Sequence, residues 1–184
     1  MSEQQFIRST APTLAGIKTG SLFPYRYGSK AEAISELRGW NRRLSPKGLR
    51  LLPLRMTEGF AMLYLYRPGQ LEADLRNRDA AVLLREAGYP ARDEAACIRE
   101  LRRRLAERED FPHEIGLFLS YPPEDVRGFI EHRDLGCKCV GCWKVYGDEK
   151  AARRKFAQYR RCTDRYLRRN AQGCTLERLT VKTA

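Results

Sequence analysis

The sequence lacks any long apolar stretch. Its longest wholly apolar run, from Phe60 to Tyr66, is far shorter than the roughly 20 residues that a membrane-spanning helix needs. The first residues also lack a cationic segment leading into an apolar one, which is the pattern of a secretory signal peptide. We therefore expect a cytoplasmic protein with no membrane partner.

The chain also lacks the signatures of two common enzyme classes. Residues 16–21 contain the residue types of a phosphate-binding loop in the wrong order, so the sequence predicts no NTPase. His113 and Glu114 resemble the start of a zinc-protease helix, but that motif needs a second histidine where this chain has Leu117. No enzyme activity is identified by these patterns.

What the chain does have is enough apolar residues for a folded protein. Of its 184 residues, 42% are hydrophobic and 10% aromatic, which fits a globular protein rather than a disordered or fibrous one. We expect a single domain over residues 1–184. Lys and Arg number 35 against 23 Asp and Glu, and the resulting net charge of +12 favours anionic partners.

Periodicity in the sequence predicts an α+β fold. Short β-rich runs predict strands near residues 17–23, 49–54, 60–66, 115–119 and 143–146. Apolar residues at helical spacing predict helices near residues 29–44, 70–87, 93–105, 121–132 and 148–173. We expect residues 49–54 and 60–66 to pair antiparallel and residues 115–119 to join the same sheet. The predicted architecture is a mostly antiparallel sheet of about four to five strands, covered by helices and followed by a long C-terminal helix.

Six cysteines are present, and in a reducing compartment they are better interpreted as thiols, metal ligands or redox groups than as disulfides. Three of them, Cys137, Cys139 and Cys142, lie in one glycine-bearing loop. They are candidate ligands for zinc or an iron-sulfur cluster, since Cys139 and Cys142 have a usual ligand-pair spacing. We expect these two thiols to come close together. The alternatives are a redox-active thiol and ordinary cysteines without a ligand.

His113 and Glu114 form a candidate acid, base or ligand pair, because imidazole titrates near neutral pH and a carboxylate is adjacent. The alternative is a histidine that fixes the entry of the following apolar segment by hydrogen bonding.

The predicted C-terminal helix is strongly cationic. Between Arg153 and Arg169 it contains eight cations and a single acid, Asp164. Its aromatic residues recur at the spacing of the helix face that packs on the core, so they are not evident stacking platforms for bases. Four arginines are the candidate anion-binding residues: Arg160, Arg161, Arg168 and Arg169. Nucleic acid or an acidic protein is the expected partner, and a merely solvated face is the alternative.

Several segments carry a family resemblance. Residues 111–116 read FPHEIG, residues 121–130 read YPPEDVRGFI, and residues 141–148 read GCWKVYGD. Together with residues 11–21 and 159–163, they resemble domain-of-unknown-function family 3793, a family of anaerobic bacteria. The resemblance covers nearly the whole chain but implies no activity, cofactor or catalytic residue. It also implies that relatives can have other residues in place of Cys137, Cys139 or Cys142, which disfavours an obligatory metal site.

We therefore expect a binding or accessory protein linked to anaerobic redox or metal metabolism. Its ligand would occupy a polar cleft near His113, Glu114, Lys144 and Tyr146, with the cysteine loop beside it. One alternative is a cysteine-dependent redox enzyme with His113 as proton carrier. The other is a basic module that binds nucleic acid or an acidic protein partner.

Overall fold

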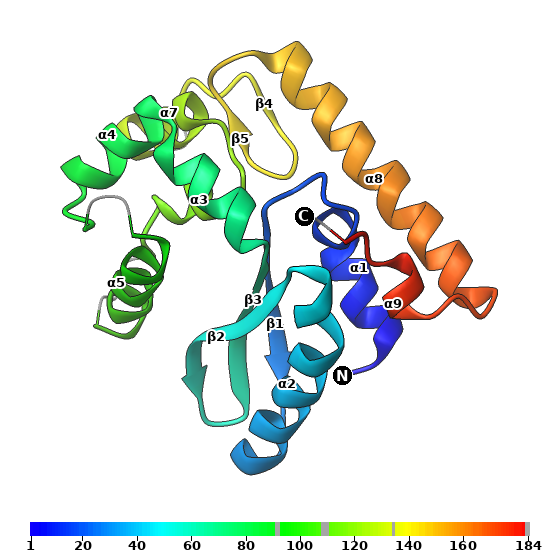
Figure 1. The fold of residues 1–184 in the computed structure, drawn as a ribbon. Helices are drawn as coiled ribbons and strands as arrows, with labels where there is room; N and C mark the ends of the chain where they lie inside the picture. The colour runs from blue at the N-terminus through cyan, green and yellow to red at the C-terminus, as the bar shows by residue number, and fades with distance from the viewer. Residues whose placement is uncertain (91–92, 108–110, 134, 183–184) are drawn as a thin grey trace. The chain divides into compact units, whose positions relative to one another are not determined.

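The computed structural model describes residues 1–90, 93–107, 111–133 and 135–182 (Figure 1). Helices predominate and every strand pair in these ranges is antiparallel, which confirms the predicted α+β class. The strands are divided between a three-stranded and a two-stranded sheet. Within the same ranges, no helix combines the length and the apolar character needed to cross a bilayer.

The chain divides into two compact units. Unit 1 comprises Met1–Pro68 and Arg161–Ala184, and unit 2 comprises Gly69–Arg160. The long helix α8 (Glu149–Ala171) begins in unit 2 and ends in unit 1. The expectation of one domain over the whole chain stays a prediction.

Unit 1 is built on the three-stranded sheet. Strands β1 (Gly20–Arg26), β2 (Arg50–Thr57) and β3 (Phe60–Tyr66) pair in the order β1-β3-β2. The predicted hairpin of β2 and β3 is confirmed, and Gly59 in its turn has a φ of 70°, which favours glycine. Strand β1 ends later than predicted and includes Pro24. Proline is tolerated there because β1 is an edge strand.

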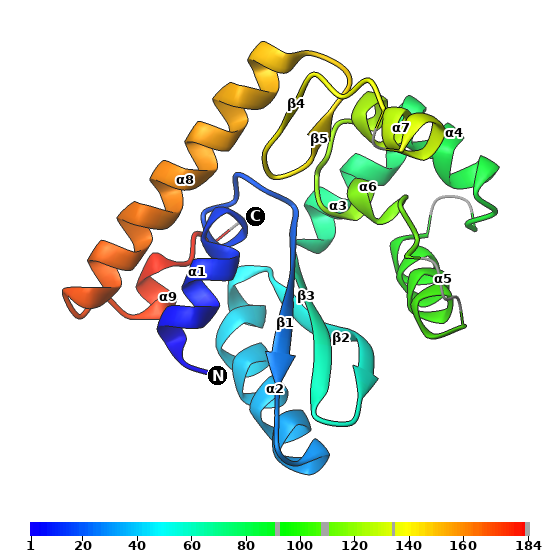
Figure 2. The ribbon, with the colours of Figure 1, turned by 180° about the vertical axis from the view of Figure 1, so that it is seen from behind.

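Helices pack against this sheet in unit 1 (Figure 2). The predicted α2 (Lys30–Leu44) is confirmed, and its Trp40 stacks on Phe6 with ring centroids 4.4 Å apart. Phe6 belongs to α1 (Glu3–Leu14), which periodicity did not predict. The short α9 (Leu176–Leu179) was not predicted either, and it contributes two leucines to the same core.

The buried side chain of Arg67 connects four segments of unit 1 by hydrogen bonds. Its side chain is 1% exposed and donates hydrogen bonds of 2.8 Å to the carbonyls of Thr13, Leu14 and Val181, with a longer one of 3.4 Å to Lys47. Thr13 and Leu14 are the last residues of α1, where the helix dipole favours a cation. Burial lowers the pKa of Arg67 from its usual value.

Unit 2 is mostly helical. The single helix predicted over residues 70–87 is two helices, α3 (Pro68–Arg76) and α4 (Arg78–Glu86). They are separated by Asn77, whose side chain accepts hydrogen bonds from the first backbone N–H groups of α4. Asparagine favours this capping role over a helix interior, which explains the break.

Three other predicted helices are confirmed: α5 (Glu94–Glu107), α7 (Pro123–His132) and α8. A two-stranded ribbon of β4 (Cys139–Val140) and β5 (Lys144–Val145) connects α7 to α8. The strand predicted at residues 143–146 therefore exists, although it is shorter and pairs outside the main sheet.

The strand predicted at residues 115–119 is wrong. Ile115–Phe118 forms the short helix α6, packed against α7, and it does not join the sheet. All four of its residues are buried. The run therefore has no alternation of apolar and polar residues that would distinguish a strand from a buried helix. Gly116 permits the packing, because a Cβ there would lie 2.8 Å from a methyl group of Val126.

Candidate functional site around helix α7

Asp125 fixes the segment after β5 against the first turn of α7. This carboxylate is 3% exposed and accepts three hydrogen bonds. Oδ2 accepts from Trp143 Nε1 at 2.6 Å, and Oδ1 accepts from the backbone N–H groups of Tyr146 and Gly147 at 2.7 Å each. Because all of these donors point at one buried acid, β5 and the following turn are held in a fixed position on α7.

Tyr146 lies flat against α7 because position 128 is glycine. A Cβ on Gly128 would lie 2.4 Å from Cγ of Tyr146, closer than two carbon atoms can approach. The phenol hydroxyl donates a hydrogen bond to the carbonyl of Arg133, just beyond the end of α7. Tyr146 thus connects the middle of α7 to its C-terminal cap.

Phe129 of α7 is the centre of the site. The ring of His113 packs edge-on against it with centroids 4.9 Å apart, and Lys144 Nζ lies 5.2 Å from the same centroid. The Arg133 guanidinium hydrogen bonds to Nε2 of His113. We call these residues the α7–β5 cluster: His113, Phe129, Arg133, Lys144 and Tyr146.

Arg133 has an unusual backbone. Its φ of 54° and ψ of −111° place a non-glycine residue at positive φ, directly after α7. Such a conformation typically costs about 1–3 kcal/mol and is found where surrounding contacts hold it. Here its own N–H bonds to the Phe129 carbonyl at 2.9 Å, and Tyr146 bonds to its carbonyl. These two hydrogen bonds hold the conformation, and the Arg133 side chain lies next to His113.

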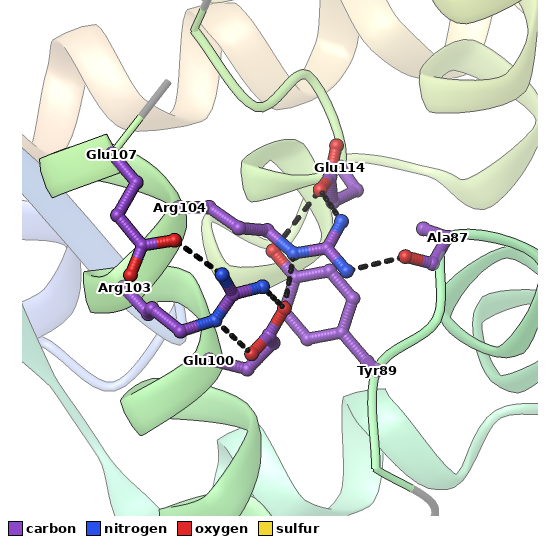
Figure 3. A network of polar contacts seen from close by, with 7 residues as sticks. All are labelled: Ala87, Tyr89, Glu100, Arg103, Arg104, Glu107 and Glu114. Atoms are coloured by element: carbon purple, nitrogen blue, oxygen red, sulfur yellow. Dashed lines mark hydrogen bonds and ion pairs between the residues drawn. The ribbon is translucent and has the colours of Figure 1, made fainter.

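Glu114 takes part in a different network, drawn in Figure 3. This carboxylate is 7% exposed and accepts hydrogen bonds from Arg104 at 2.9 Å and from the Tyr89 hydroxyl at 3.1 Å. Arg104 also donates to Glu100 at 2.7 Å and lies over the Tyr89 ring, 4.2 Å from its centroid. Burial, with the adjacent Glu114 carboxylate, raises the pKa of Tyr89. Each of these groups has a partner within the network, so the role of Glu114 is to hold α5 beside α6.

The structure thus brings together His113, Lys144 and Tyr146, three of the four residues predicted to bind a ligand. Arg133 and Phe129 complete the arrangement but were not singled out from the sequence. Phe129 lies in residues 121–130, one of the segments that resemble the family, and this resemblance could have marked it as a candidate site residue. The positive φ of Arg133 has no signature in the sequence.

A hollow of about 530 Å³ lies along α7 and shares Tyr146 with the cluster. Charged residues of both signs line it, including Glu124, Arg127 and Glu131. Arg127 is paired with Glu131 at 3.6 Å and with Glu86 at 3.4 Å, so its charge is compensated. The positive charge of the hollow is therefore paired with nearby carboxylates.

The cysteine loop lies on the ribbon. Cys139 is opposite Val145 in the β4–β5 pairing, Cys142 is exposed and Cys137 is half-buried. A Cβ on Gly141 would lie 2.2 Å from the Phe156 ring, so glycine lets the loop pack directly on α8. Among the residues that the structure describes, no three His, Cys, Asp or Glu side chains are arranged to hold a metal ion. The proximity of Cys139 and Cys142 stays a prediction.

The predicted anion-binding arginines all lie on α8 and all are exposed: Arg160, Arg161, Arg168 and Arg169. The aromatic residues Phe156 and Tyr159 of the same helix are buried, as their spacing predicts. Arg160 is the last residue of unit 2, and the other three belong to unit 1.

Comparison with known proteins identifies a family that matches most of the chain. Residues 6–180 match the family described as proteins of unknown function, DUF3793. No curated protein and no solved structure is significantly similar to this chain.

Proposed function

The chain belongs to the DUF3793 family, and we propose that it is a binding protein whose α7–β5 cluster holds a small oxyanion, either a phosphate or a carboxylate group. One observation carries the proposal: His113 and Lys144 both lie against the Phe129 ring on unit 2, and the Arg133 guanidinium hydrogen bonds to His113. A cytoplasmic location and a role in redox or metal metabolism are parts of the same proposal. They are supported by the thiol-rich sequence, in which none of the six cysteines forms a disulfide within the described residues.

The chemistry of the cluster suits an oxyanion. A guanidinium presents a planar fork that matches two oxygens of a phosphate or carboxylate, and an ammonium adds a compact second charge. Within the described residues Arg133 forms no ion pair with a carboxylate, so its charge is not compensated there. The Phe129 ring shields one side from water, which strengthens the electrostatic attraction.

Backbone strain supports a binding role for Arg133 in particular. Strained non-glycine residues cluster at ligand sites, where the conformation positions a side chain before the ligand arrives. Asp125 and Gly128 act as positioning residues, since the first fixes the segment that carries Tyr146 and the second admits its ring. Preorganisation of this kind lowers the entropy that binding would otherwise lose.

Calorimetric titration of the full chain with inorganic phosphate, pyrophosphate and citrate tests the proposal. We expect saturable binding of at least one of these anions. Arg133→Gln and Lys144→Gln should each weaken it about tenfold or more, the effect of losing one charged hydrogen bond. Arg127→Gln is the matched control, because Arg127 lies on α7 but is paired with Glu131. No saturable binding, or an equal loss in the control, would overturn the proposal.

A cysteine-dependent redox enzyme remains the alternative. The exposure of Cys142 is the observation that favours it, since a reactive thiol must be accessible. Reaction of the folded protein with a thiol reagent, compared with Cys142→Ser, tests this alternative independently of anion binding.

A further inference from the structure

The last turns of α8 present a row of arginines in unit 1. Arg161, Arg165 and Arg168 follow one another at helical spacings of four and three residues, which places them on one stripe, and Arg169 lies beside it. All four are exposed. We call them the α8 arginine face.

The opposite side of these turns is anchored to the core of unit 1. Cys162, Tyr166 and Leu167 pack against the core cluster there. The Asn170 side chain donates hydrogen bonds to Glu3 at 3.1 Å and to the Cys174 carbonyl at 3.2 Å. The rotation of the helix is therefore fixed, and the arginines point to solvent because the apolar side is occupied.

The charge of this face is not compensated by nearby acids. Within the described residues, none of the four arginines forms an ion pair with a carboxylate, even though Asp164 lies at the edge of the stripe. Four guanidinium groups are thus held at close spacing on a rigid support. Such an array attracts a surface with regularly spaced negative charge.

We propose that the α8 arginine face docks on the phosphate backbone of duplex nucleic acid. A guanidinium fork binds phosphate oxygens in a bidentate manner. From Arg161 to Arg168 the helix rises about 10 Å at 1.5 Å per residue, and duplex DNA carries one negative charge per about 1.7 Å of its axis. The phosphate array is therefore dense enough to meet every arginine of the face.

The structure favours a duplex over a single strand and over a lipid surface. A single strand is usually held by aromatic rings that stack on its bases, but Tyr166 packs against the core instead of joining the face. A membrane-surface helix needs an apolar side that enters the lipid, and the apolar side of α8 is covered here. Backbone contact without base contact also predicts binding that does not depend on sequence.

Fluorescence anisotropy of the full chain with a labelled 20-base-pair duplex tests the proposal at salt concentrations from 50 to 200 mM. If three to four phosphates are neutralised, affinity should fall about 40- to 150-fold over this range. Replacing Arg161, Arg165, Arg168 and Arg169 by Gln should abolish most of the binding and flatten the salt dependence.

The matched control removes the same charge elsewhere in unit 1, from exposed arginines on α1, β1 and α2: Arg8, Arg26, Arg38 and Arg42. It should retain most of the affinity and the salt dependence. Circular dichroism checks that both variants are folded. Equal loss in the two variants, or binding of poly-glutamate as tight as binding of the duplex, would overturn the proposal.

Discussion

Helix α5 and the end of α8 are both rich in arginine, yet their side chains are used in different ways. In α5, Arg103 pairs with Glu100 at 2.8 Å and also with Glu107, and Arg104 pairs with Glu100 at 2.7 Å and Glu114 at 2.9 Å. The α8 arginine face has no such pair among the described residues. The same residue type therefore forms ion pairs with carboxylates in one helix, half-exposed at Arg103 and buried at Arg104, and a charged surface of unit 1 in the other.

The difference shows that the number of cations on a helix says little about its role. What distinguishes the two helices is whether carboxylates lie within reach and how much of each guanidinium is buried. The Arg104 side chain is 5% exposed and must be paired, since an isolated buried charge is very costly. An exposed arginine needs no partner, because water solvates it.

The largest expected effect comes from breaking the buried pair. Arg104→Ala should lower the free energy of unfolding by about 3–5 kcal/mol, because Glu114 would stay buried without its cation. Arg165→Ala, on the exposed face of α8, is the matched control and should change it by less than about 0.5 kcal/mol. Urea unfolding of the two variants measures both values, and similar losses would contradict the comparison.

Arg67, a buried arginine bonded to backbone carbonyls of unit 1, should give the next largest effect. Arg67→Met removes the donor that three carbonyls share at 2.8 Å, and we expect a loss of about 1–3 kcal/mol in unfolding free energy. Methionine keeps the apolar stem of the side chain but is two atoms shorter than arginine, so the loss reports the missing hydrogen bonds together with the space that the guanidinium leaves. An unchanged free energy of unfolding in urea would show that the cost of burying the Arg67 cation offsets the gain from its hydrogen bonds.

The contribution of the α5 ion pairs to the unfolding free energy should depend on pH in the acid range. Hydrogen bonds from Arg103 and Arg104 lower the pKa of Glu100 from 4.5 to about 2. A carboxyl whose folded pKa is depressed stabilises the fold above its unfolded pKa, and this contribution is lost as the pH falls through the folded value. The stability difference between wild type and Glu100→Gln should therefore shrink between about pH 4.5 and pH 2.

The matched control for this pH prediction is Asp164→Asn on α8, where the carboxylate has no ion pair among the described residues. This variant removes a carboxylate without removing an ion pair of that kind, so its stability difference from wild type should stay smaller than that of Glu100→Gln above pH 4.5. Thermal unfolding measured across this range checks both variants, and parallel curves for the two would contradict the prediction.

The smallest effect concerns Arg133, an exposed arginine whose backbone rather than its charge is unusual. Arg133→Gly should be more stable than Arg133→Ala by about 1 kcal/mol, because glycine accepts a positive φ without strain. Both variants lack the guanidinium and should lose anion binding equally. Equal thermal stability of the pair would show that the backbone relaxes once the side chain is removed.

Much of the fold followed from local patterns. The helices α2, α5, α7 and α8 have an apolar stripe or a clear start signal, and the β2–β3 hairpin has β-rich runs around a glycine turn. Each of these signals lies within a few residues of the chain, so it can be recognised without knowing what the element packs against. The α6 segment has no such signal, because an apolar run that is buried on all sides fits a strand and a helix equally.

The candidate site was predictable only in part. His113, Lys144 and Tyr146 meet because Asp125 and Gly128 fix β5 against α7, and neither contact is visible in the sequence. Glu114 follows His113 directly, yet its side chain enters the Arg104 network instead. Adjacent residues often point to different surroundings, so closeness in sequence is a weak guide to a shared pocket.

The sequence by itself determined the net charge and the position of each arginine along its helix. It also determined the pairs at three and four residues, such as Arg103 with Glu100, because helix geometry alone brings them together. Only the tertiary structure decided that Glu114, ten residues beyond Arg104, neutralises it and that the α8 arginine face stays open. The physical reason is that a distant pair forms only where packing of apolar faces brings its two segments together, and that packing depends on the whole chain.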